Sequence, residues 1–517
     1  MTASIISGAR TLSHADLQAR AERAAAGFAT LGIGRGDAVA IMLRNDFAFF
    51  EASAAIGQLG GYPVPVNWHY TVDEADYLFR NCGAKAIVIH ADLLRAVEAA
   101  LPPGVPVLVV ATPPEIAAAF RVSPEEAAVP AGRTDWNAWL EGFERRAPEV
   151  ADPPGAMIYT SGTTGRPKGV KRAPPTAEQA ASSAVTIGTV FGLAAAFANP
   201  GAKRISSIIP GPMYHSAPNT YSGLAVRAGA DVILQPRFDP EDMLRLIEKH
   251  RVTHIQMVPT MFVRLLKLPE ETRRKYDVSS LEFIVHAAAP CPPHVKRAMI
   301  EWWGPIINEY YGATETGAVV FCTAQEWLAH PGTVGKPLPN VKLRILGEDG
   351  KDVERGTPGD IYVRLTTGLD FTYHGDDEKR RKAEVDGLIS VGDVGYQDED
   401  GFIYLCDRRN NMVISGGVNI YPAEIEAELL KVPGVADGAV FGVPDEEFGE
   451  ALCAVVQPYP EARIDAAFVR AELAKHLARY KIPKIIDFQP TLPREDSGKI
   501  FKRKLRDPYW EKAGRAI

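Results

Sequence analysis

Cysteine is scarce in this sequence and is not arranged as disulfide frameworks or zinc sites require. The five cysteines are scattered, their number is odd, and no two of them form a CxxC pair; they are Cys82, Cys291, Cys322, Cys406 and Cys453. Disulfides are rare in a reducing cytoplasm, and structural zinc sites need closely spaced cysteines and histidines. The pattern argues against both kinds of site and favours a cytoplasmic protein.

The chain also has no excess of positive charge and no visible export signal. It carries 57 Lys and Arg against 64 Asp and Glu, a formal net charge of −7. Nucleic-acid binding needs a basic surface, so this balance argues against nucleic acid as the main partner. The N-terminal segment MTASIISGARTLSHADL lacks a basic stretch followed by an apolar one, so we expect no secretory signal.

Charge is absent between Glu178 and Lys203, where AASSAVTIGTVFGLAAAFA is nearly long enough to cross a bilayer. The stretch is rich in Ala, Gly, Ser and Thr and poor in Leu and Ile, so its insertion into a membrane would be weak. A helix buried between the layers of a large protein explains it better. We therefore predict no integral membrane span.

At 517 residues the chain is too long for one ordinary core, so we expect two or more domains. Short apolar runs alternate with amphipathic helical patterns, which predicts an α/β fold with doubly wound, largely parallel sheets in several layers. The strand-like runs are DAVAIML, AKAIVIH, PVLVVA, ISSIIP, DVILQ, THIQMV, LEFIVHA, PIINEY and DIYVRL.

A change of pattern after Cys406 predicts a second, smaller unit. We assign residues 1–406 to the large N-terminal part, the polar run 407–411 to a linker, and residues 412–517 to a small α+β domain. There PAEIEAELLKV reads as a helix with Pro422 in its first turn, and GAVFGV with EALCAVVQP reads as a hairpin. The segment FVRAELAKHLARY would place on one helical face Val469, Leu473, Leu477 and Tyr480.

The densest chemical signal is the segment YTSGTTGRPKGV. Glycines let a backbone approach phosphate closely, while Ser and Thr hydroxyls and exposed amides donate hydrogen bonds to its oxygens. A Walker A loop is excluded, because that pattern needs GxxxxGK followed by Ser or Thr, and Gly follows the lysine here. A glycine-rich surface turn is the weaker alternative. The candidate phosphate-binding residues are Thr160, Ser161, Gly162, Thr163, Thr164, Gly165 and Lys168.

This segment resembles the signature loop of the adenylate-forming superfamily, which contains acyl- and aryl-CoA synthetases, nonribosomal adenylation domains and luciferases. Further segments resemble the superfamily's signatures in its usual order, so the resemblance covers essentially the whole chain. It implies an AMP-forming acyl-CoA synthetase, in which a carboxylic acid and ATP form an acyl-adenylate and CoA then takes the acyl group. It also implies a requirement for Mg²⁺ and a mobile C-terminal domain that rotates between the two steps.

The segment YYGATE resembles the superfamily's aromatic-Gly-x-Thr-Glu motif. The resemblance implies that Tyr311 stacks on adenine beside Gly312 and that Thr314 contacts the α-phosphate. Glu315 would hold Mg²⁺ together with Thr160. A π-face suits a base, and carboxylate oxygens are hard ligands suited to Mg²⁺. Taken alone, the segment reads almost equally well as a capped turn.

VGDVGY and DRRNN resemble the superfamily's ribose-binding elements. By that resemblance Asp393 accepts hydrogen bonds from the ribose hydroxyls, and Arg408 also reaches the ribose. A turn Asp beside glycine is the alternative for the first. Relatives commonly have Asp or Lys at the hinge position, where this chain has Asn410. Asn tolerates unusual backbone angles almost as well, so a pivot is still expected.

Two C-terminal segments resemble elements that serve CoA and catalysis. Ser415, Gly416 and Gly417 resemble the loop along the pantetheine arm, where glycines let a thiol pass beside the backbone. Phe448 falls where some relatives place an aromatic near the CoA nucleotide, with a core role as an equal alternative. Lys499 matches the terminal signature and would be the catalytic lysine that stabilises charge during adenylation. Alone, it would read as one cation of a solvated basic run.

The acid is the least determined part of the prediction. His215 resembles an aromatic-His element that lines the acyl pocket, with a core histidine as the alternative. The other expected pocket residues are 257–261, 285–289 and Tyr310. We favour a fatty acid of medium or longer chain, with aryl and phenylpropenoid acids as the alternative. Pocket volume decides such specificity, and it is not readable from one sequence.

Three rival functions are weighed against this one. A stand-alone adenylation enzyme that loads a carrier protein would share every ATP motif but would not turn over free CoA. A luciferase-like oxygenase would need peroxide chemistry, which no residue marks. A non-enzymatic binding protein would be expected to lack Lys499 or Glu315, and both are present. A homodimer is left open beside a monomer.

Overall fold

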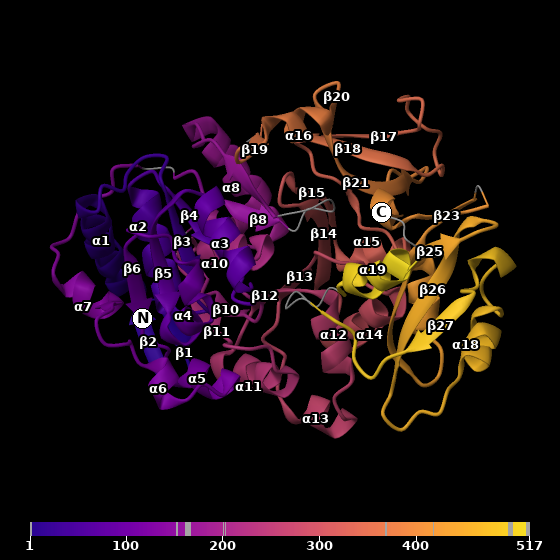
Figure 1. Cartoon of the computed structure of the whole chain (residues 1–517), viewed down its shortest axis with the longest axis horizontal. Coiled ribbons are helices and arrows are strands. Elements are labelled where there is room, and N and C mark those ends of the chain that lie inside the picture. Colours follow the sequence, from indigo (N-terminus) through magenta and orange to yellow (C-terminus); the bar gives the residue numbers. More distant parts are fainter. Residues whose placement is uncertain are drawn as a thin grey trace.

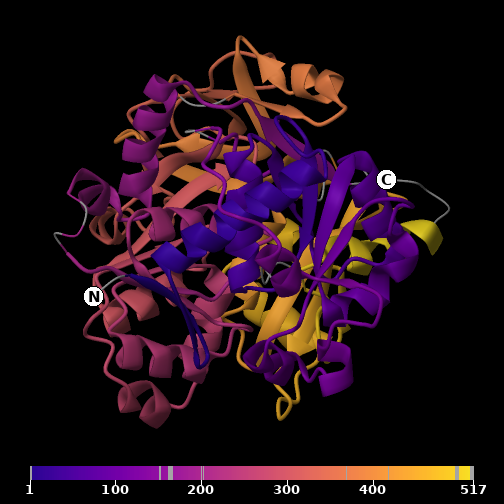
Figure 2. The same ribbon diagram turned by 90° about the vertical axis from the view of Figure 1, so that its left-hand side faces the viewer.

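The computed structural model places the N-terminal sheets at one end of the molecule and the C-terminal domain at the other (Figures 1 and 2). The residues that it describes are 3–150, 153–160, 167–199, 201, 203–367, 370–416, 418–494 and 500–512, without the side chain of Asn410.

The first sheet has five parallel strands in the order β4-β3-β5-β6-β7. Val39, Ile41 and Ile87 are fully buried, as expected for parallel strands covered on both faces. The strands are β3 Ala38–Met42, β4 Tyr62–Pro65, β5 Ala84–His90, β6 Val107–Val110 and β7 Thr134–Asp135. The helices of this segment are α1 His14–Thr30, α2 Phe47–Gln58, α3 Val72–Asn81, α4 Ala91–Val97, α5 Pro114–Phe120, α6 Pro124–Ala127 and α7 Trp136–Glu141.

The second sheet has nine strands in the order β16-β15-β14-β13-β12-β10-β11-β1-β2. All its pairs from β14 to β1 are parallel, and the strands at both ends are antiparallel. The carboxyl ends of neighbouring parallel strands meet at one edge, so the segments after β10, β12, β13 and β14 emerge together. The strands are β1 Ser4–Ser7, β2 Arg10–Ser13, β10 Ser206–Ile209, β11 Asp231–Leu234, β12 His254–Met257, β13 Phe283–His286, β14 Ile307–Ala313, β15 Gly317–Cys322 and β16 Lys336–Pro337. The helices are α8 Ala177–Val190, α9 Ala194–Ala198, α10 Ser216–Arg227, α11 Pro240–His250, α12 Pro259–Leu266, α13 Glu270–Lys275, α14 Pro293–Trp303 and α15 Ala324–Ala329.

Three smaller sheets complete the fold. One has the order β19-β9-β8, one has β17-β18-β21-β20 with β22 beside β21, and the C-terminal one has β24-β23-β26-β25 with β27 beside β26. Their strands are β8 Ile158–Thr160, β9 Lys168–Arg172, β17 Val341–Leu346, β18 Gly359–Leu365, β19 Phe371–Tyr373, β20 Glu384–Val385, β21 Leu388–Gln397, β22 Ile403–Arg408, β23 Val413–Ser415, β24 Val418–Ile420, β25 Val435–Asp445, β26 Gly449–Pro458 and β27 Ile485–Phe488. The helices are α16 Asp377–Lys382, α17 Pro422–Leu429, α18 Ala466–Leu473 and α19 Lys502–Lys512. The predicted α/β layers and the small α+β unit are thus confirmed.

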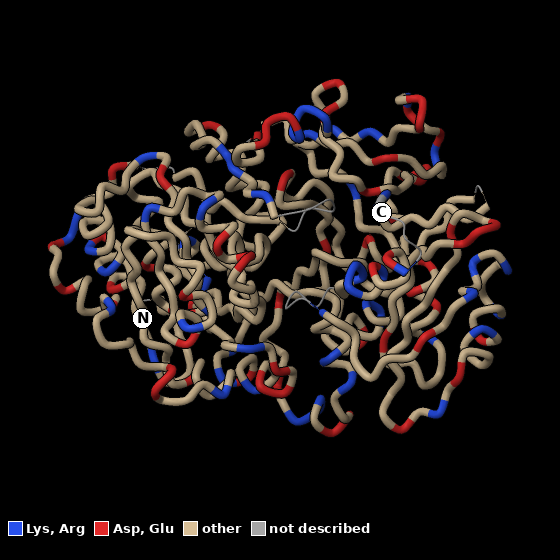
Figure 3. The backbone as a smooth tube through the Cα atoms, in the orientation of Figure 1, with Lys and Arg blue, Asp and Glu red and all other residues tan. Residues whose placement is uncertain are grey.

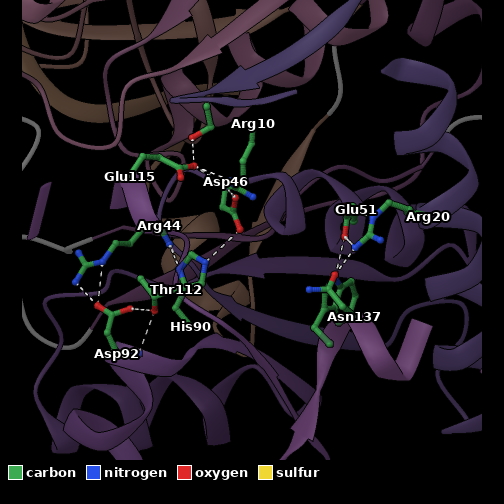
Figure 4. Close-up of polar contacts among 12 residues, drawn as sticks. Arg10, Arg20, Arg44, Asp46, Glu51, His90, Asp92, Thr112, Glu115 and Asn137 are labelled. Atoms are coloured by element: carbon green, nitrogen blue, oxygen red, sulfur yellow. Dashed lines mark hydrogen bonds and ion pairs between the residues drawn. The ribbon is translucent and has the colours of Figure 1, made fainter. Parts of the chain in front are cut away.

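A buried polar network ties the first sheet to the β1–β2 hairpin (Figure 4). The Asp46 carboxylate accepts hydrogen bonds from Arg10 at 2.6 Å and from His90 Nε2 at 3.3 Å. His90 Nδ1 accepts from the Arg44 backbone N–H at 3.1 Å, which assigns the ring proton to Nε2. Burial alone would raise the pKa of Asp46, but His90 and Arg10 outweigh it and lower that pKa to about 2.

The residue before Asp46 fixes a segment of the second sheet. Asn45 is buried, its Nδ2 donates to the Gly211 carbonyl, and its Oδ1 accepts from the Met213 backbone N–H, both at 2.9 Å. These bonds hold the segment that follows β10 and leads to His215.

One predicted helix is shorter than expected. The helix in FVRAELAKHLARY ends at Leu473, and Tyr480 is 54% exposed instead of sharing the buried face. Arg470 donates hydrogen bonds to the carbonyls of Pro483 and Lys484 at 3.1 and 2.6 Å. These bonds hold the chain where it folds back after the helix.

The uncharged stretch after Glu178 forms α8 and α9, as the sequence predicted, but α8 is not buried between layers. Only Gly188 and Val190 are buried along it, and Val185 is 68% exposed. Within the described part of the chain, no helix combines the length and apolarity needed to cross a membrane. Much of the remaining surface of α8 lines the cavity described next.

Candidate active site

A cavity of about 2590 Å³ is lined by residues of both the large part and the C-terminal domain. Its wall includes the segments that follow β10, β12, β13 and β14, where the carboxyl ends of the parallel strands meet. The predicted site residues that line it are Thr160, His215, Tyr310, Tyr311, Gly312, Thr314, Glu315, Asp393 and Arg408. Residues far apart in the sequence are therefore brought to one place.

The β14–β15 hairpin presents the YYGATE residues to the cavity. A Cβ on Gly312 would lie 1.9 Å from the Gly317 carbonyl oxygen, so only glycine permits the close approach of the two strands. The Thr316 hydroxyl accepts from the Ala313 backbone N–H at 3.1 Å and fixes the turn. Glu315 lies between these contacts, at the turn of the hairpin.

Tyr311, Asp393 and Arg408 form one hydrogen-bonded group. The Tyr311 hydroxyl donates to Asp393 Oδ2 at 2.7 Å, and Arg408 Nε lies 3.3 Å from Asp393 Oδ1. Burial, and then the Asp393 carboxylate, raise the pKa of Tyr311 well above its usual value, so its hydroxyl stays a donor. Asp393 and Arg408 are direct partners of the antiparallel pair β21–β22, which explains why the two motifs meet.

Two residues that the sequence did not single out hold Glu315 in place. Arg172 Nη2 donates to the carbonyls of Thr314 and Glu315, the latter at 3.0 Å. The Tyr373 hydroxyl donates to Glu315 Oε1 at 3.0 Å, and burial followed by Glu315 raises the pKa of Tyr373. Arg172 on β9 and Tyr373 on β19 belong to adjacent strands and both line the cavity, so one small sheet supports the loop.

We expect Arg172→Met to lower adenylation by ~10–100-fold and to raise the Mg²⁺ concentration needed for half-maximal rate, the usual scale for losing a residue that orients a metal ligand. Pyrophosphate release measured across a magnesium titration tests this. Lys171→Met is the matched control, because successive strand residues face opposite sides and Lys171 lies over the Tyr62 ring at 4.6 Å. A lower rate with unchanged magnesium dependence would mean that Arg172 does not act through Glu315.

The glycine-rich segment is described only at its ends. Thr160 and Lys168 are direct partners of the β8–β9 pair, and Thr160 lines the cavity. Lys168 does not line it and instead forms an ion pair with Asp376. The candidates Ser161, Gly162, Thr163, Thr164 and Gly165 lie outside the described residues.

The C-terminal domain contains two predicted elements, the terminal signature and the proposed pantetheine loop, and they differ in their relation to the cavity. Arg494 and Ile500, on either side of the undescribed Lys499, both line the cavity. Ser415 and Gly416 do not, and Gly417 lies outside the described residues.

Phe448 is not a core residue. Its ring is 39% exposed and lies under Lys484 Nζ at 4.4 Å. A Cβ on Gly416 would come within 2.9 Å of the same ring. Phe448 therefore packs on the proposed pantetheine loop rather than in the interior.

The predicted linker is anchored on both sides. Arg409 Nε donates to Asp360 of β18 at 2.8 Å. The Asp407 carboxylate accepts from its neighbour Arg408 N–H at 2.7 Å and from the Ala423 N–H of α17 at 3.0 Å. The division at 407–411 stays a prediction.

The expected acid pocket is partly correct. All of residues 257–261 and the small Ala287, Ala288 and Ala289 line the cavity. Val285 and His286 do not; both are fully buried, because they lie inside β13 rather than after it. His215 directly precedes α10, is half-buried and lines the cavity, which favours the acid-pocket interpretation over a core histidine.

The cavity wall also includes residues that the sequence gave no reason to choose. They come from α8, from the segment that follows it and from α10, and they are Ala180, Ser183, Ala184, Thr186, Ile187, Val190, Phe191, Phe197, Ser216, Asn219, Thr220, Gly223, Leu224 and Arg227.

Basic residues outnumber acidic ones in the cavity lining, the reverse of their order in the whole chain. Along the backbone the two signs are interspersed, without a broad basic face in the view of Figure 3. The cavity cations contributed by the C-terminal domain are Arg494, Lys502, Arg503 and Arg506.

Glu315 and Thr160 both line the cavity and offer oxygen atoms of the kind that would hold Mg²⁺. The carboxylate of Glu315 accepts from Tyr373 through Oε1 only, so within the described contacts Oε2 is available to a metal. No group of three or more His, Cys, Asp and Glu suited to a metal occurs among the described residues. That does not count against Mg²⁺, which commonly uses one or two carboxylates plus phosphates and water.

The chain matches known proteins over nearly its whole length. Residues 2–368 match the AMP-binding enzyme family, and residues 424–499 match the AMP-binding enzyme C-terminal domain. The chain is 33% identical to a feruloyl-CoA synthase of Amycolatopsis sp, covering 96% of this chain and 94% of that one. It is 29% identical to a long-chain-fatty-acid–CoA ligase of Mycobacterium tuberculosis, covering 96% and 93%.

A solved structure, ATP-bound MatB from Rhodopseudomonas palustris, shares the fold with a TM-score of 0.78 at 30% identity, over 98% of this chain and 96% of that one. The chain therefore belongs to the AMP-binding enzyme family. Its activity is that of an AMP-forming acid–thiol ligase, which uses ATP, Mg²⁺ and CoA. The predicted superfamily, reaction class and cofactors are confirmed.

Proposed function

We propose that this ligase activates carboxylic acids with an apolar body and favours a fatty acid of medium or longer chain. The observation that carries the proposal is the wall formed by α8, whose cavity-lining residues bear no charge. Similarity to the fatty-acid–CoA ligase of Mycobacterium tuberculosis supports the same substrate class.

In the first half-reaction the carboxylate attacks the α-phosphorus of ATP and pyrophosphate leaves. Tyr311 takes the adenine face, Asp393 accepts from the ribose, and Thr314 donates to the α-phosphate. His215 borders the carboxylate end of the acid. These roles are supported by the gathering of the four side chains in one cavity and by the bond from Tyr311 to Asp393. Bound Mg²⁺ would supply positive charge beside the phosphates, and Arg172 holds the backbone of its ligand Glu315.

In the second half-reaction the C-terminal domain rotates, Lys499 leaves the cavity and Ser415–Gly417 brings the CoA thiol to the acyl-adenylate. The proposal draws on the present arrangement, in which Arg494 and Ile500 line the cavity whereas Ser415 and Gly416 do not. The structure is therefore interpreted as the adenylate-forming orientation.

An aryl or phenylpropenoid acid is the second candidate. Phe191 and Tyr310 make an edge-to-face contact with ring centroids 5.6 Å apart, and both line the cavity, where they offer an aromatic wall. Identity of 33% to a feruloyl-CoA synthase favours this class equally.

A pyrophosphate-release assay over a panel of acids, each with and without CoA, tests the proposed function. We expect the highest kcat/KM with octanoate to hexadecanoate and acyl-CoA as the product. Higher values with ferulate or benzoate would replace the fatty acid by an aryl acid. Pyrophosphate release without acyl-CoA formation would indicate a carrier protein as acceptor, and no release with any acid would overturn the proposal.

We also place the enzyme in the cytoplasm, since all five cysteines are free thiols. A homodimer stays a hypothesis, and light scattering of the purified chain would decide between it and a monomer.

A further inference from the structure

Gly223 differs from the other glycines that lie inside helices of the described chain. Those are Gly27, Gly57 and Gly188, and a Cβ on them would come within 2.5, 3.2 and 3.1 Å of a neighbouring residue. A Cβ on Gly223 would have nothing within 4 Å, and its φ is not in the positive range that favours glycine. Glycine is a poor helix former, and neither packing nor backbone geometry requires it in α10.

The empty space beside Gly223 belongs to the cavity. Ser216, Thr220, Gly223 and Arg227 are spaced at four, three and four residues, so they share one face of α10, and all of them line the cavity. Gly223 is thus the one residue on this face of α10 that has no side chain. The space beside Gly223 is therefore available to a ligand.

The cavity-lining face of α8 also carries mostly small side chains. Ala180, Ser183, Ala184 and Ile187 share one face of α8 at helical spacing and line the same cavity. Phe191, which follows α8, packs against Tyr221 of α10 with ring centroids 5.3 Å apart, so the two helices are joined at that point. Apart from the exposed Arg227, which lies one turn beyond Gly223, the residues named on these two lining faces carry no charge.

The position of Gly223 also sets the length that an acid needs in order to reach it. His215 caps the N-terminus of α10, and Gly223 lies eight residues further along, which is roughly 12 Å at 1.5 Å per residue. An acid held with its carboxylate near His215 reaches Gly223 only if its body is extended. Short acids end before this point.

We propose that Gly223 is the residue that admits extended apolar acids, and that their distal part lies between α8 and α10 beside it. This inference rests on the proposed function. It narrows the preferred substrates of the enzyme to acids long enough to pass Gly223. It attributes the preference for long over short acids to the volume left by one missing side chain, as expected where apolar contacts decide specificity.

Gly223→Leu tests the proposal with dodecanoate and the shortest acid that the wild-type enzyme accepts. We expect kcat/KM for dodecanoate to fall by about tenfold or more, while the value for the short acid stays near wild type. Ala184→Leu, on the cavity-lining face of α8, should shift the ratio in the same direction. Ala181→Leu is the matched control, because it adds the same atoms to an exposed position of α8 that does not line the cavity.

Gly223→Ala separates a structural role from a role in specificity. Its melting temperature should equal or exceed that of the wild type, since alanine is the better helix former and has room here. Equal loss of both acids in a folded Gly223→Leu enzyme, or an unchanged ratio, would overturn the inference about Gly223. Absence of pyrophosphate release by the wild type with every acid would instead overturn the proposed function itself.

Discussion

Lys499→Ala is expected to lower pyrophosphate release by ~10²–10³-fold, the usual scale for losing one preorganised group that stabilises transition-state charge. Conversion of supplied acyl-adenylate and CoA to the thioester should persist, because Lys499 is proposed to leave the cavity before that step. Measuring both half-reactions separately distinguishes the two outcomes. Equal loss in both would refute a lysine that serves adenylation alone.

A matched control for Lys499 exists in the same basic run. Lys504 is exposed, does not line the cavity and lies over the Phe501 ring at 5.0 Å. Lys504→Ala removes the same charge and should adenylate at close to the wild-type rate. If the two variants were equally impaired, a solvated basic surface rather than one catalytic lysine would explain the effect.

Gly417→Leu should abolish thioester formation while leaving adenylation intact. A leucine would fill the proposed route of the pantetheine thiol, and a small misplacement of reacting groups costs as much as ~10²-fold. A single-turnover experiment without CoA should give a normal burst of pyrophosphate. Addition of CoA should then release acyl-CoA at least ~10²-fold more slowly than in the wild type.

A substitution at the neighbouring Gly416 would not separate a folding defect from a blocked thiol route. Gly416 has φ +57° and its Cβ would meet Phe448, so a substitution there would strain the hairpin directly. The unfolding transition of Gly417→Leu must still match the wild type before its kinetics are interpreted. A folded variant that makes acyl-CoA at the normal rate would exclude this loop as the CoA route.

Sequence patterns predicted the sheets well because their signals are local. Apolar runs such as AKAIVIH and THIQMV are β5 and β12. The acid-pocket residues and the YYGATE hairpin gather at the carboxyl ends of neighbouring parallel strands, whereas Asp393, Arg408 and Thr160 come from antiparallel strand pairs. The short α18 was missed because its end depends on Arg470 reaching carbonyls more than ten residues away.

The supporting residues of the site were not predictable in the same way. Arg172 reads as one more cation of the run KGVKR until β9 places it under Thr314, more than 140 residues later. Tyr373 comes from an unremarkable strand, and its role appears only through its bond to Glu315. The space beside Gly223 is a property of packing between helices, and a sequence does not record empty volume.

The distribution of charge has a kinetic consequence for polyanionic substrates. The enzyme carries a net charge of −7, which repels ATP and CoA at long range, while the described residues of its cavity lining have a small excess of Lys and Arg over Asp and Glu. At physiological ionic strength charges are screened beyond about 8 Å, so an approaching nucleotide hardly senses the distant acidic surface. It does sense the cations of the cleft, where low-dielectric walls focus the field. Dissolved salt thus lets the local charge of the cavity lining, rather than the charge of the whole molecule, govern the rate of encounter.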